Sequence, residues 1–368
     1  MGFTLPFYLV FRFARQLVFV FVATLLLVVT GDFVELSREA GSRGIEDAPI
    51  LSMAFLHAPS VLNKGLPFVF LIAALTTFLG FARSSELVVV RAAGVSAWKI
   101  LGAPLILAVS LGVAAFGVYN PLAAATLAQF ERLDVKYFRG QDSLLTISNE
   151  GLWLRQADPT GNTVIHANRA SGDGTELIGV TLFTFDTSGK MIEQMAAPVA
   201  ELEPGRWVIN DADRWIILEG ENGSELRQAD ARNTIVPTEL TTNLILESFA
   251  DPNALSFWSL PAFIETLDAS GFSSVRHQLY FQSELAKPLL FAAMVLIGAG
   301  FSMRHVRFGS TGSMVLGCVL SGFALFFMAD IAEALGSSGA VPVFLAAWVV
   351  PSSAFLFGAA LLFNLEDG

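Results

Sequence analysis

The feature that most constrains this 368-residue chain is a set of six long stretches without a charged residue. A helix needs roughly 20 apolar residues to cross the hydrocarbon core of a bilayer. The two shortest stretches fall slightly below that length, and we expect Arg15 and Lys287 to extend them by reaching toward the membrane surface. The sequence therefore predicts six transmembrane helices, containing Gln16–Gly31, Gly65–Ala82, Ile100–Phe130, Pro288–Met303, Phe308–Ala329 and Leu335–Leu365.

Arginine and lysine residues indicate how these helices are oriented. Because the number of helices is even, both termini are expected on one side of the membrane. With the N-terminus in the cytoplasm, the inner segments carry seven basic residues and the short outer loops carry four, as the positive-inside rule requires. The inner residues are Arg12, Arg15, Arg83, Arg91, Lys99, Arg304 and Arg307, and the outer ones are Arg38, Arg43, Lys64 and Lys287.

The segment between the third and fourth helices differs in composition from the rest. Residues 131–278 carry the whole net charge of −11, and the remainder of the chain is neutral. By the expected topology this segment lies outside the cytoplasm, and its acidity argues against binding to nucleic acid. The predicted organisation is three helices in residues 1–130, an inserted soluble domain in 131–278, and three helices in 279–368.

The centre of the inserted segment predicts an all-β, jelly-roll-like domain. Short runs rich in β-branched and aromatic residues alternate with turns that contain Gly, Pro, Asp and Asn. Many short strands at this spacing are typical of a sandwich or jelly roll. The expected strands are Leu144–Ser148, Gly151–Ala157, Thr163–Ala167, Ile178–Asp186, Trp207–Ile209 and Arg214–Glu219, and a helix is expected over Ala254–Gly271.

One of these strands has apolar residues on both faces. In the run from Val180 to Asp186, valine and leucine alternate with threonine and phenylalanine. This pattern fits an ordinary sandwich core, and it also fits a groove that holds a lipid chain.

Motifs of catalysis and metal binding are missing from the sequence. The one Gly-Lys pair, Gly189-Lys190, lacks the glycine that a phosphate loop places five residues earlier. The four histidines show no metal-ligand spacing, and the one cysteine, Cys318, lies in a predicted span. We therefore predict no catalytic residue and no metal site. A transporter subunit, a receptor or a scaffold is favoured over an enzyme.

The charged segment Arg83–Lys99 lies between the second and third spans and predicts a short helix. Ser84 is a candidate N-cap, and Glu86 falls in the first turn, where the helix dipole favours a carboxylate. Gly94 can end the helix in the left-handed conformation, and Ser96 can cap the next helix.

This predicted helix, residues 84–95, is amphipathic, with Leu87, Val90 and Gly94 on one face. The functional interpretation is a coupling helix that sits in a cleft of another protein. The alternative is an interfacial helix that only anchors the hairpin of the second and third spans.

The run RSSELVVVRAAGVS, which starts at Arg83, resembles the signature of the LptF/LptG permease family. The resemblance extends over nearly the full chain. It includes GLW from Gly151, DPNALS from Asp251 and HQLYFQSELAKPL from His277. The first two of these three stretches look more like the LptG branch of the family.

This resemblance implies a permease subunit of the transporter that extracts lipopolysaccharide from the inner membrane and passes it to a periplasmic protein bridge. The implied partners are an LptF-like permease, an LptB-like ATPase dimer, an LptC-like single-span protein and lipopolysaccharide itself. The chain is expected to bind no cofactor, because ATP and magnesium belong to the ATPase. The alternative interpretation is a mechanotransmitting or sensor protein that couples an ATPase to the outer domain without lipid passage.

Candidate site residues follow from the resemblance combined with the chemistry of the ligands. The ATPase-coupling candidates are Arg83, Glu86, Leu87, Val90, Arg91 and Gly94. Aromatic side chains suit acyl chains, and basic ones suit lipid phosphates near the outer interface. The lipid-binding candidates are Phe33, Arg38, Phe68, Arg132, Lys136 and Phe326.

Acidic residues complicate this prediction. The resemblance implies a basic residue where Asp32 stands and two in succession where the chain has Arg38-Glu39, which suggests different head-group chemistry or cations from the partner permease. The alternative role for Arg38 is that of an interfacial residue paired with Glu35. Farther along, Glu284 and Lys287 are spaced to pair on one helix face, and Asp330 and Glu333 share a face near the outer end of the fifth span.

Overall fold

The computed structural model of the chain contains two compact units. One unit consists of Met1–Glu131, Pro252–Pro261 and Val275–Gly368, and the other of Arg132–Asp251 and Ala262–Ser274. The residues whose structure is described are 4–45, 47–139, 152–158, 161–170, 176–186, 190–203, 205–220, 223–238, 252–269, 273–303 and 311–367.

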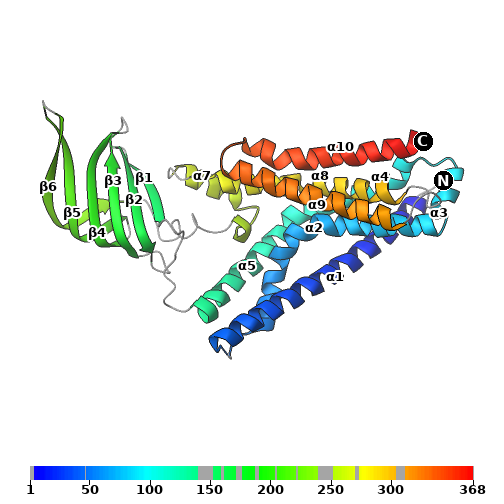
Figure 1. Cartoon of the computed structure of the whole chain (residues 1–368), viewed down its shortest axis with the longest axis horizontal. Coiled ribbons are helices and arrows are strands. Elements are labelled where there is room, and N and C mark those ends of the chain that lie inside the picture. Colours follow the sequence, from blue (N-terminus) through cyan, green and yellow to red (C-terminus); the bar gives the residue numbers. More distant parts are fainter. Residues whose placement is uncertain are drawn as a thin grey trace. The chain divides into compact units, whose positions relative to one another are not determined.

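The first unit is a helical bundle. The described residues contain six helices that are long and apolar enough to cross a membrane, which confirms the predicted number. The start of α1, the end of α10 and the short helix α3 lie at the same end of this bundle (Figure 1). The helices are α1 (Thr4–Arg43), α2 (Ile50–Arg83), α3 (Glu86–Ala92), α4 (Ala97–Ala114), α5 (Asn120–Asp134), α8 (Val275–Ser302), α9 (Thr311–Ser337) and α10 (Val343–Asp367).

Some helix boundaries differ from the predicted ones, because the prediction used charged residues to mark the turns between helices. Helix α2 begins at Ile50 and passes through Lys64, which the sequence placed in a loop. Helix α9 continues to Ser337, and the turn before α10 contains Gly339 with φ of 75°. That turn has no charged residue, so the sixth predicted span began too early, at Leu335.

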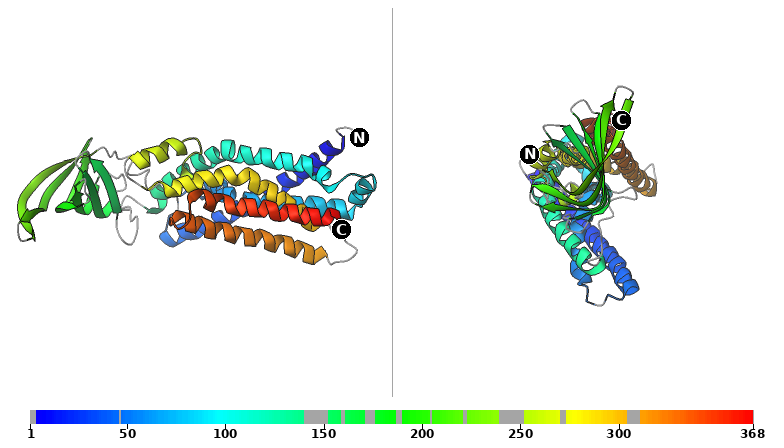
Figure 2. Two further views of the ribbon diagram at one scale, coloured as in Figure 1. Left: turned by 90° about the horizontal axis from the view of Figure 1, so that it is seen from above. Right: turned by 90° about the vertical axis from the view of Figure 1, so that its left-hand side faces the viewer.

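Helix α8 is the centre of the bundle. Every side chain from Phe291 to Gly300 is buried. Figure 2 shows α8, in yellow, between α4, in cyan, and α10, in red. A Cβ atom at Gly112 of α4 would overlap the backbone of Pro288, and one at Gly298 would lie 2.8 Å from the Cβ of Ala74 on α2. Small residues therefore allow the backbone of α8 to come into close contact with neighbouring helices, as is usual in membrane bundles.

The third span is interrupted by a π-helical turn, η1 (Ala115–Tyr119), between α4 and α5. The indole nitrogen of Trp258 donates a hydrogen bond of 2.9 Å to the carbonyl of Gly117 within this turn. The next residue after the turn, Asn120, accepts a bond of 2.8 Å from the backbone of Phe257 and donates to the hydroxyl of Tyr280 at 2.6 Å. The π-helical turn thus holds the segment that precedes α7 (Leu260–Ala269). A second such turn, η2 (Val135–Arg139), follows α5.

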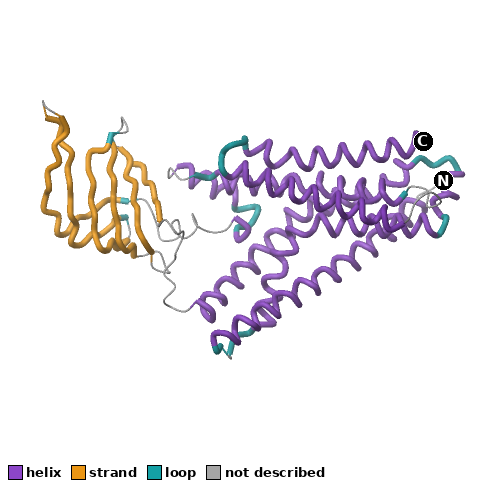
Figure 3. Tube along the Cα trace, in the orientation of Figure 1, coloured by secondary structure: helices purple, strands orange, loops and turns teal. Residues whose placement is uncertain are grey.

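The second unit contains an antiparallel sheet, so the predicted inserted all-β domain is confirmed (Figure 3). Its six described strands pair in sequence order, which makes this part of the sheet a meander. The strands are β1 (Leu152–Asp158), β2 (Gly161–Ala170), β3 (Glu176–Phe185), β4 (Met191–Glu203), β5 (Arg206–Gly220) and β6 (Gly223–Pro237).

Several local predictions in this unit need correction. Two predicted strands form the single strand β5, which passes through Asp211 with φ of 53°. Strands β4 and β6 were not predicted, because they are rich in alanine, glutamate and other residues of low β propensity. The expected helix over Ala254–Gly271 begins as a 3₁₀ turn, η3 (Pro252–Ala254), and becomes α-helical only at Leu260. The predicted strand Leu144–Ser148 lies outside the described residues.

One face of the sheet carries its hydrophobic core, which includes Ile165, Val180, Leu182 and Trp207. Gly179 has φ of 66°, and a Cβ there would overlap the side chain of Asn168 on β2, so this position requires glycine. The opposite face of β3 is half-buried. Among the described strands, the face opposite the core is compatible with both predicted interpretations, a second packed layer and a groove.

Candidate lipid pocket and coupling helix

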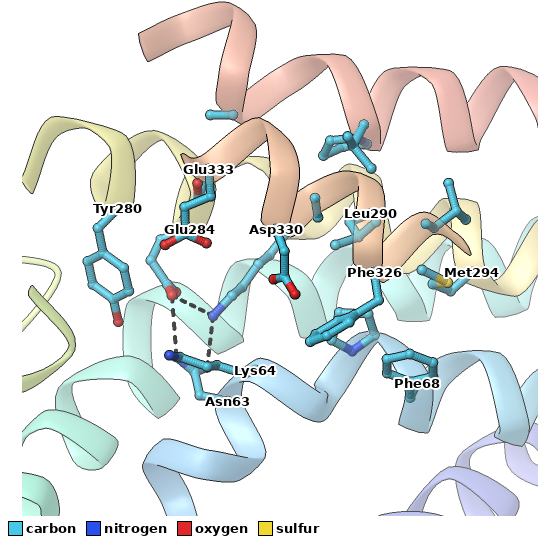
Figure 4. Close-up of a pocket in the computed structure, with 18 of the residues that line it drawn as sticks. Asn63, Lys64, Phe68, Tyr280, Glu284, Leu290, Met294, Phe326, Asp330 and Glu333 are labelled. Atoms are coloured by element: carbon cyan, nitrogen blue, oxygen red, sulfur yellow. Dashed lines mark hydrogen bonds and ion pairs between the residues drawn. The ribbon is translucent and has the colours of Figure 1, made fainter. Parts of the chain in front are cut away.

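A pocket of about 220 Å³ lies within the helical unit, between α2, α8, α9 and α10. Phe68 of α2 and Phe326 of α9 form one wall, with their ring centroids 5.6 Å apart (Figure 4). Both residues were predicted to contact lipid, and the structure brings them together although they are far apart in the sequence. Leu290 and Met294 of α8 continue this apolar wall.

The opposite end of the pocket holds a buried, charged network. The ammonium of Lys287 donates to Glu284 Oε1 at 2.5 Å and to Asn63 Oδ1 at 2.8 Å. The amide of Asn63 donates to the same carboxylate oxygen at 3.3 Å. The side chains of Lys287 and Glu284 are only 11% and 2% exposed. Removal of either charge would leave the other buried without a counter-charge, which is strongly destabilising.

The predicted pairing of Glu284 with Lys287 is confirmed. The expectation that Lys287 reaches toward the membrane surface is wrong, because its ammonium is held inside the bundle by Glu284 and Asn63. Sequence reasoning missed Asn63. The sequence did contain a signal, the polar pair Asn63-Lys64 within an otherwise apolar stretch. Because Lys64 is charged, the prediction assigns this pair to a loop between helices.

Three further charged side chains line the pocket without an ion pair among the described residues. They are Lys64 of α2 and the acids Asp330 and Glu333 of α9, and all three are exposed. Figure 4 shows Asp330 directed from α9 into the pocket between Glu284 and Phe326, and Glu333 on the side of the pocket that holds Glu284. The spacing of Asp330 and Glu333 does place them on one face, as predicted.

The other predicted lipid contacts lie elsewhere. Phe33 is 40% exposed on α1, and Arg38, on the same helix, is exposed. The alternative ion pair of Arg38 with Glu35 is absent from the part of α1 that the structure describes. Arg132 and Lys136 belong to the other unit, where the Lys136 ammonium lies 5.0 Å from the centre of the Tyr137 ring.

Asp32 has a partner of its own. Its carboxylate lies 3.0 Å from Nδ1 of His57 on α2, and the His57 ring stacks on Phe130 of α5 at a centroid distance of 4.6 Å. The acid that departs from the family pattern therefore connects α1 to α2.

The predicted short helix is present as α3, with different ends. Ser84 is not its N-cap, because Ser84 closes α2, and Ser85 precedes α3 in a left-handed conformation with φ of 58°. Gly94 ends α3 with φ of 78°, and Ser96 caps α4 by accepting a bond from the backbone of Lys99. These last two expectations are confirmed.

The apolar residues of α3 form two separate surfaces. Leu87 is buried in the core of the bundle, and Val90 packs against the same core. The chain's own helices therefore cover Leu87 and part of Val90, and contact of these two residues with a partner stays a prediction. Val88 and Val89 are 55% and 69% exposed and point away from that core.

Glu86 is bound to the start of α1. Its carboxylate accepts a hydrogen bond of 3.0 Å from the hydroxyl of Tyr8 and one of 2.9 Å from Ser84. The guanidinium of Arg12 lies 3.6 Å from the same carboxylate and donates to the Tyr8 hydroxyl at 2.9 Å. We call the contact of Glu86 with Tyr8 and Arg12 the α1–α3 link. The remaining coupling candidates are placed around it, with Arg83 and Gly94 exposed and Arg91 half-buried.

These features define a class of protein. An apolar bundle with a pocket between its helices, a short helix with an exposed apolar edge at one end, and a β domain inserted in the chain are the parts of a membrane transport permease. Among the described residues, no group of His, Cys, Asp and Glu could hold a metal ion. Comparison of the sequence with protein families makes the identification specific, because residues 7–364 match the family described as lipopolysaccharide export system permease LptF/LptG. The chain belongs to this family and is a multi-pass protein of the inner membrane.

Individual relatives agree with this result. The chain is 25% identical over 334 residues to the lipopolysaccharide export system permease protein LptG of Escherichia coli K12, covering 90% of this chain and 89% of that protein. It is 23% identical over 336 residues to LptG of Haemophilus influenzae, covering 88% of each. Membership of a permease family favours a non-catalytic subunit of a lipopolysaccharide transport complex over the alternative of a sensor.

Proposed function

We propose that this chain is the LptG-type permease subunit that extracts lipopolysaccharide from the inner membrane and passes it to a periplasmic bridge. The observation that supports this most directly is the pocket. It combines an aromatic wall suited to acyl chains with the exposed cation of Lys64, which suits a lipid phosphate. In this proposal Phe33, Phe68 and Phe326 contact acyl chains, and Arg38, Arg132 and Lys136 are further phosphate contacts.

The proposed complex has further subunits. An LptF-like permease completes the lipid cavity, an LptC-like protein adds one span, and an LptB-like ATPase dimer binds ATP and magnesium, so that this chain binds no cofactor. The exposed edge of α3, formed by Val88 and Val89, supports docking of the ATPase at this helix. Arg83, Arg91 and Gly94 flank that edge, whereas Leu87 and Val90 hold α3 to the bundle.

Lipid contact can be tested by photocrosslinking. A photoreactive amino acid in place of Phe326 should form an adduct with lipopolysaccharide in the assembled complex, because this exposed ring lines the pocket. The matched control is Phe357 of α10, an exposed aromatic residue that does not line the pocket. Equal adduct formation at both positions would show that the pocket has no special role.

Orientation is the second expectation that needs a test. If both termini and α3 are cytoplasmic, a cysteine in place of Gly161, in the inserted domain, should react with an impermeant thiol reagent added to intact spheroplasts. A cysteine in place of the exposed Ala93, beside α3, should react only after lysis. Background from the native thiol is low, because Cys318 is buried. The reverse pattern of labelling contradicts the proposed orientation.

A further inference from the structure

The charges around the pocket do not suit an anion alone. Glu284 is neutralised by Lys287 at 2.5 Å, which leaves the cation of Lys64 and the two acids Asp330 and Glu333. The lining of the pocket therefore carries one more negative than positive charge. A phosphate that approaches Lys64 also meets two carboxylates, and the juxtaposition of like charges opposes its binding.

A second observation points to a missing donor. The Oε2 atom of Glu284 is buried and has no hydrogen-bond partner among the described residues, whereas Oε1 accepts from both Asn63 and Lys287. Buried carboxylate oxygens are almost always satisfied, so this atom calls for a group that can donate a hydrogen bond. Figure 4 shows Glu333 on the side of the pocket that holds Glu284, and Asp330 directed into the pocket between Glu284 and Phe326.

We propose that the acidic side of this pocket binds the ammonium group of a lipid head group that carries both a phosphate and a primary amine. A primary ammonium has three donors, which matches the buried carboxylate of Glu284 and the exposed carboxylates of Asp330 and Glu333. Its phosphate then lies toward Lys64, and its chains toward Phe68 and Phe326. A metal ion is a poorer match, because the described residues hold no cluster with metal-binding geometry.

This inference rests on the proposed function and deepens it, since it names the chemistry of the head group. Two lipids can supply that chemistry. One is lipid A decorated with phosphoethanolamine, and the other is phosphatidylethanolamine of the surrounding bilayer. The shared feature is a phosphate joined to a primary ammonium by a short linker.

The test measures lipid binding by native mass spectrometry of the complex released from nanodiscs. Lipid A with phosphoethanolamine is compared with unmodified lipid A, and phosphatidylethanolamine with phosphatidylglycerol. We expect the amine-bearing member to bind about tenfold more tightly in at least one pair, the gain from a charge-assisted hydrogen bond. The pair that shows the preference identifies the source.

The double variant Asp330→Asn, Glu333→Gln removes both negative charges while the side chains keep nearly the same shape. Because both positions are exposed, we expect the protein to fold normally. The double variant should abolish the preference for the amine. The matched control Glu35→Gln removes an exposed acid of α1 outside the pocket and should leave the preference intact.

Two outcomes overturn the inference, namely equal binding of both members in both pairs, and a preference that persists in the double variant. A third variant, Lys64→Gln, tests phosphate binding separately from recognition of the amine. It should weaken binding of all phosphate-bearing lipids while the ratio within each pair stays unchanged. Photocrosslinking at Phe326 reports lipopolysaccharide contact whether or not an amine is recognised.

Discussion

Replacement of Glu284 by leucine is expected to destabilise the helical unit by about 3–5 kcal/mol, because it leaves the ammonium of Lys287 buried without its carboxylate. The side chain of Lys287 is 11% exposed, and its other partner, the Asn63 carbonyl oxygen, carries no net charge. Exposed ion pairs are worth far less, on the order of 0–1 kcal/mol. The measurement is the thermal unfolding midpoint of the purified protein, followed by the helical signal in circular dichroism.

The matched control removes both charges. Because two apolar side chains of similar volume can replace a buried ion pair at little cost, Glu284→Leu combined with Lys287→Met should recover most of the lost stability. If the double variant is as unstable as the single one, the carboxylate does not act by neutralising Lys287. If the single variant unfolds at the wild-type temperature, the network contributes nothing to the fold.

Charge reversal at Glu86 is expected to abolish transport while the protein remains folded in the membrane. Glu86→Lys places an ammonium beside the guanidinium of Arg12 and removes the acceptor for Tyr8, so the α1–α3 link is lost. The side chains of Arg12 and Glu86 are 40% and 35% exposed, so the effect on stability is small. The measurements are co-purification of the ATPase and ATP-driven release of lipid from vesicles. Wild-type values in both assays contradict a role for Glu86 in coupling.

Tyr8→Phe distinguishes two ways in which Glu86 can act. This variant keeps the carboxylate available to a docking partner and removes one hydrogen bond of the α1–α3 link. If the link carries movement from α3 to α1, the ATPase should still co-purify while lipid release falls by roughly tenfold or more, because one hydrogen bond to a charged group is worth about 1.5–3 kcal/mol. Normal release from Tyr8→Phe together with failed docking of Glu86→Lys assigns Glu86 to the partner interface alone.

The large-scale organisation could be predicted because it depends on features that a single sequence displays. Long uncharged runs predict membrane helices, since the cost of a charge in hydrocarbon is high whatever the tertiary contacts. The insertion was visible as the segment that carries all the net charge. The end of α3 was predicted correctly because Gly94 adopts the left-handed conformation that few other residues tolerate.

The parts that could not be predicted depend on contacts between distant residues. Asn63 and Glu284 are 221 positions apart, and only the packing of α2 on α8 makes their hydrogen bond possible. The spacing of apolar residues showed that Leu87 lies on the apolar face of α3, but not what covers that face. An apolar face packs equally well against the chain's own helices and against a partner protein. Strand β6 has few β-branched residues, and its pairing with β5 decides its conformation.

The close approach of Gly112 to Pro288 has a mechanical consequence. Small residues let the backbones of α4 and α8 meet at this point, and we expect so close a contact to restrict sliding of one helix along the other, so that α4 and α8 move together. Helix α4 begins a few residues after α3, and Lys287 directly precedes the proline at this contact. In the proposed complex, a displacement of α3 by the ATPase would therefore reach the Lys287 ammonium at the pocket through the contact of α4 with α8. Docking at α3 and binding of a head group in the pocket would then be mechanically coupled through α4 and α8, without a hinge between them.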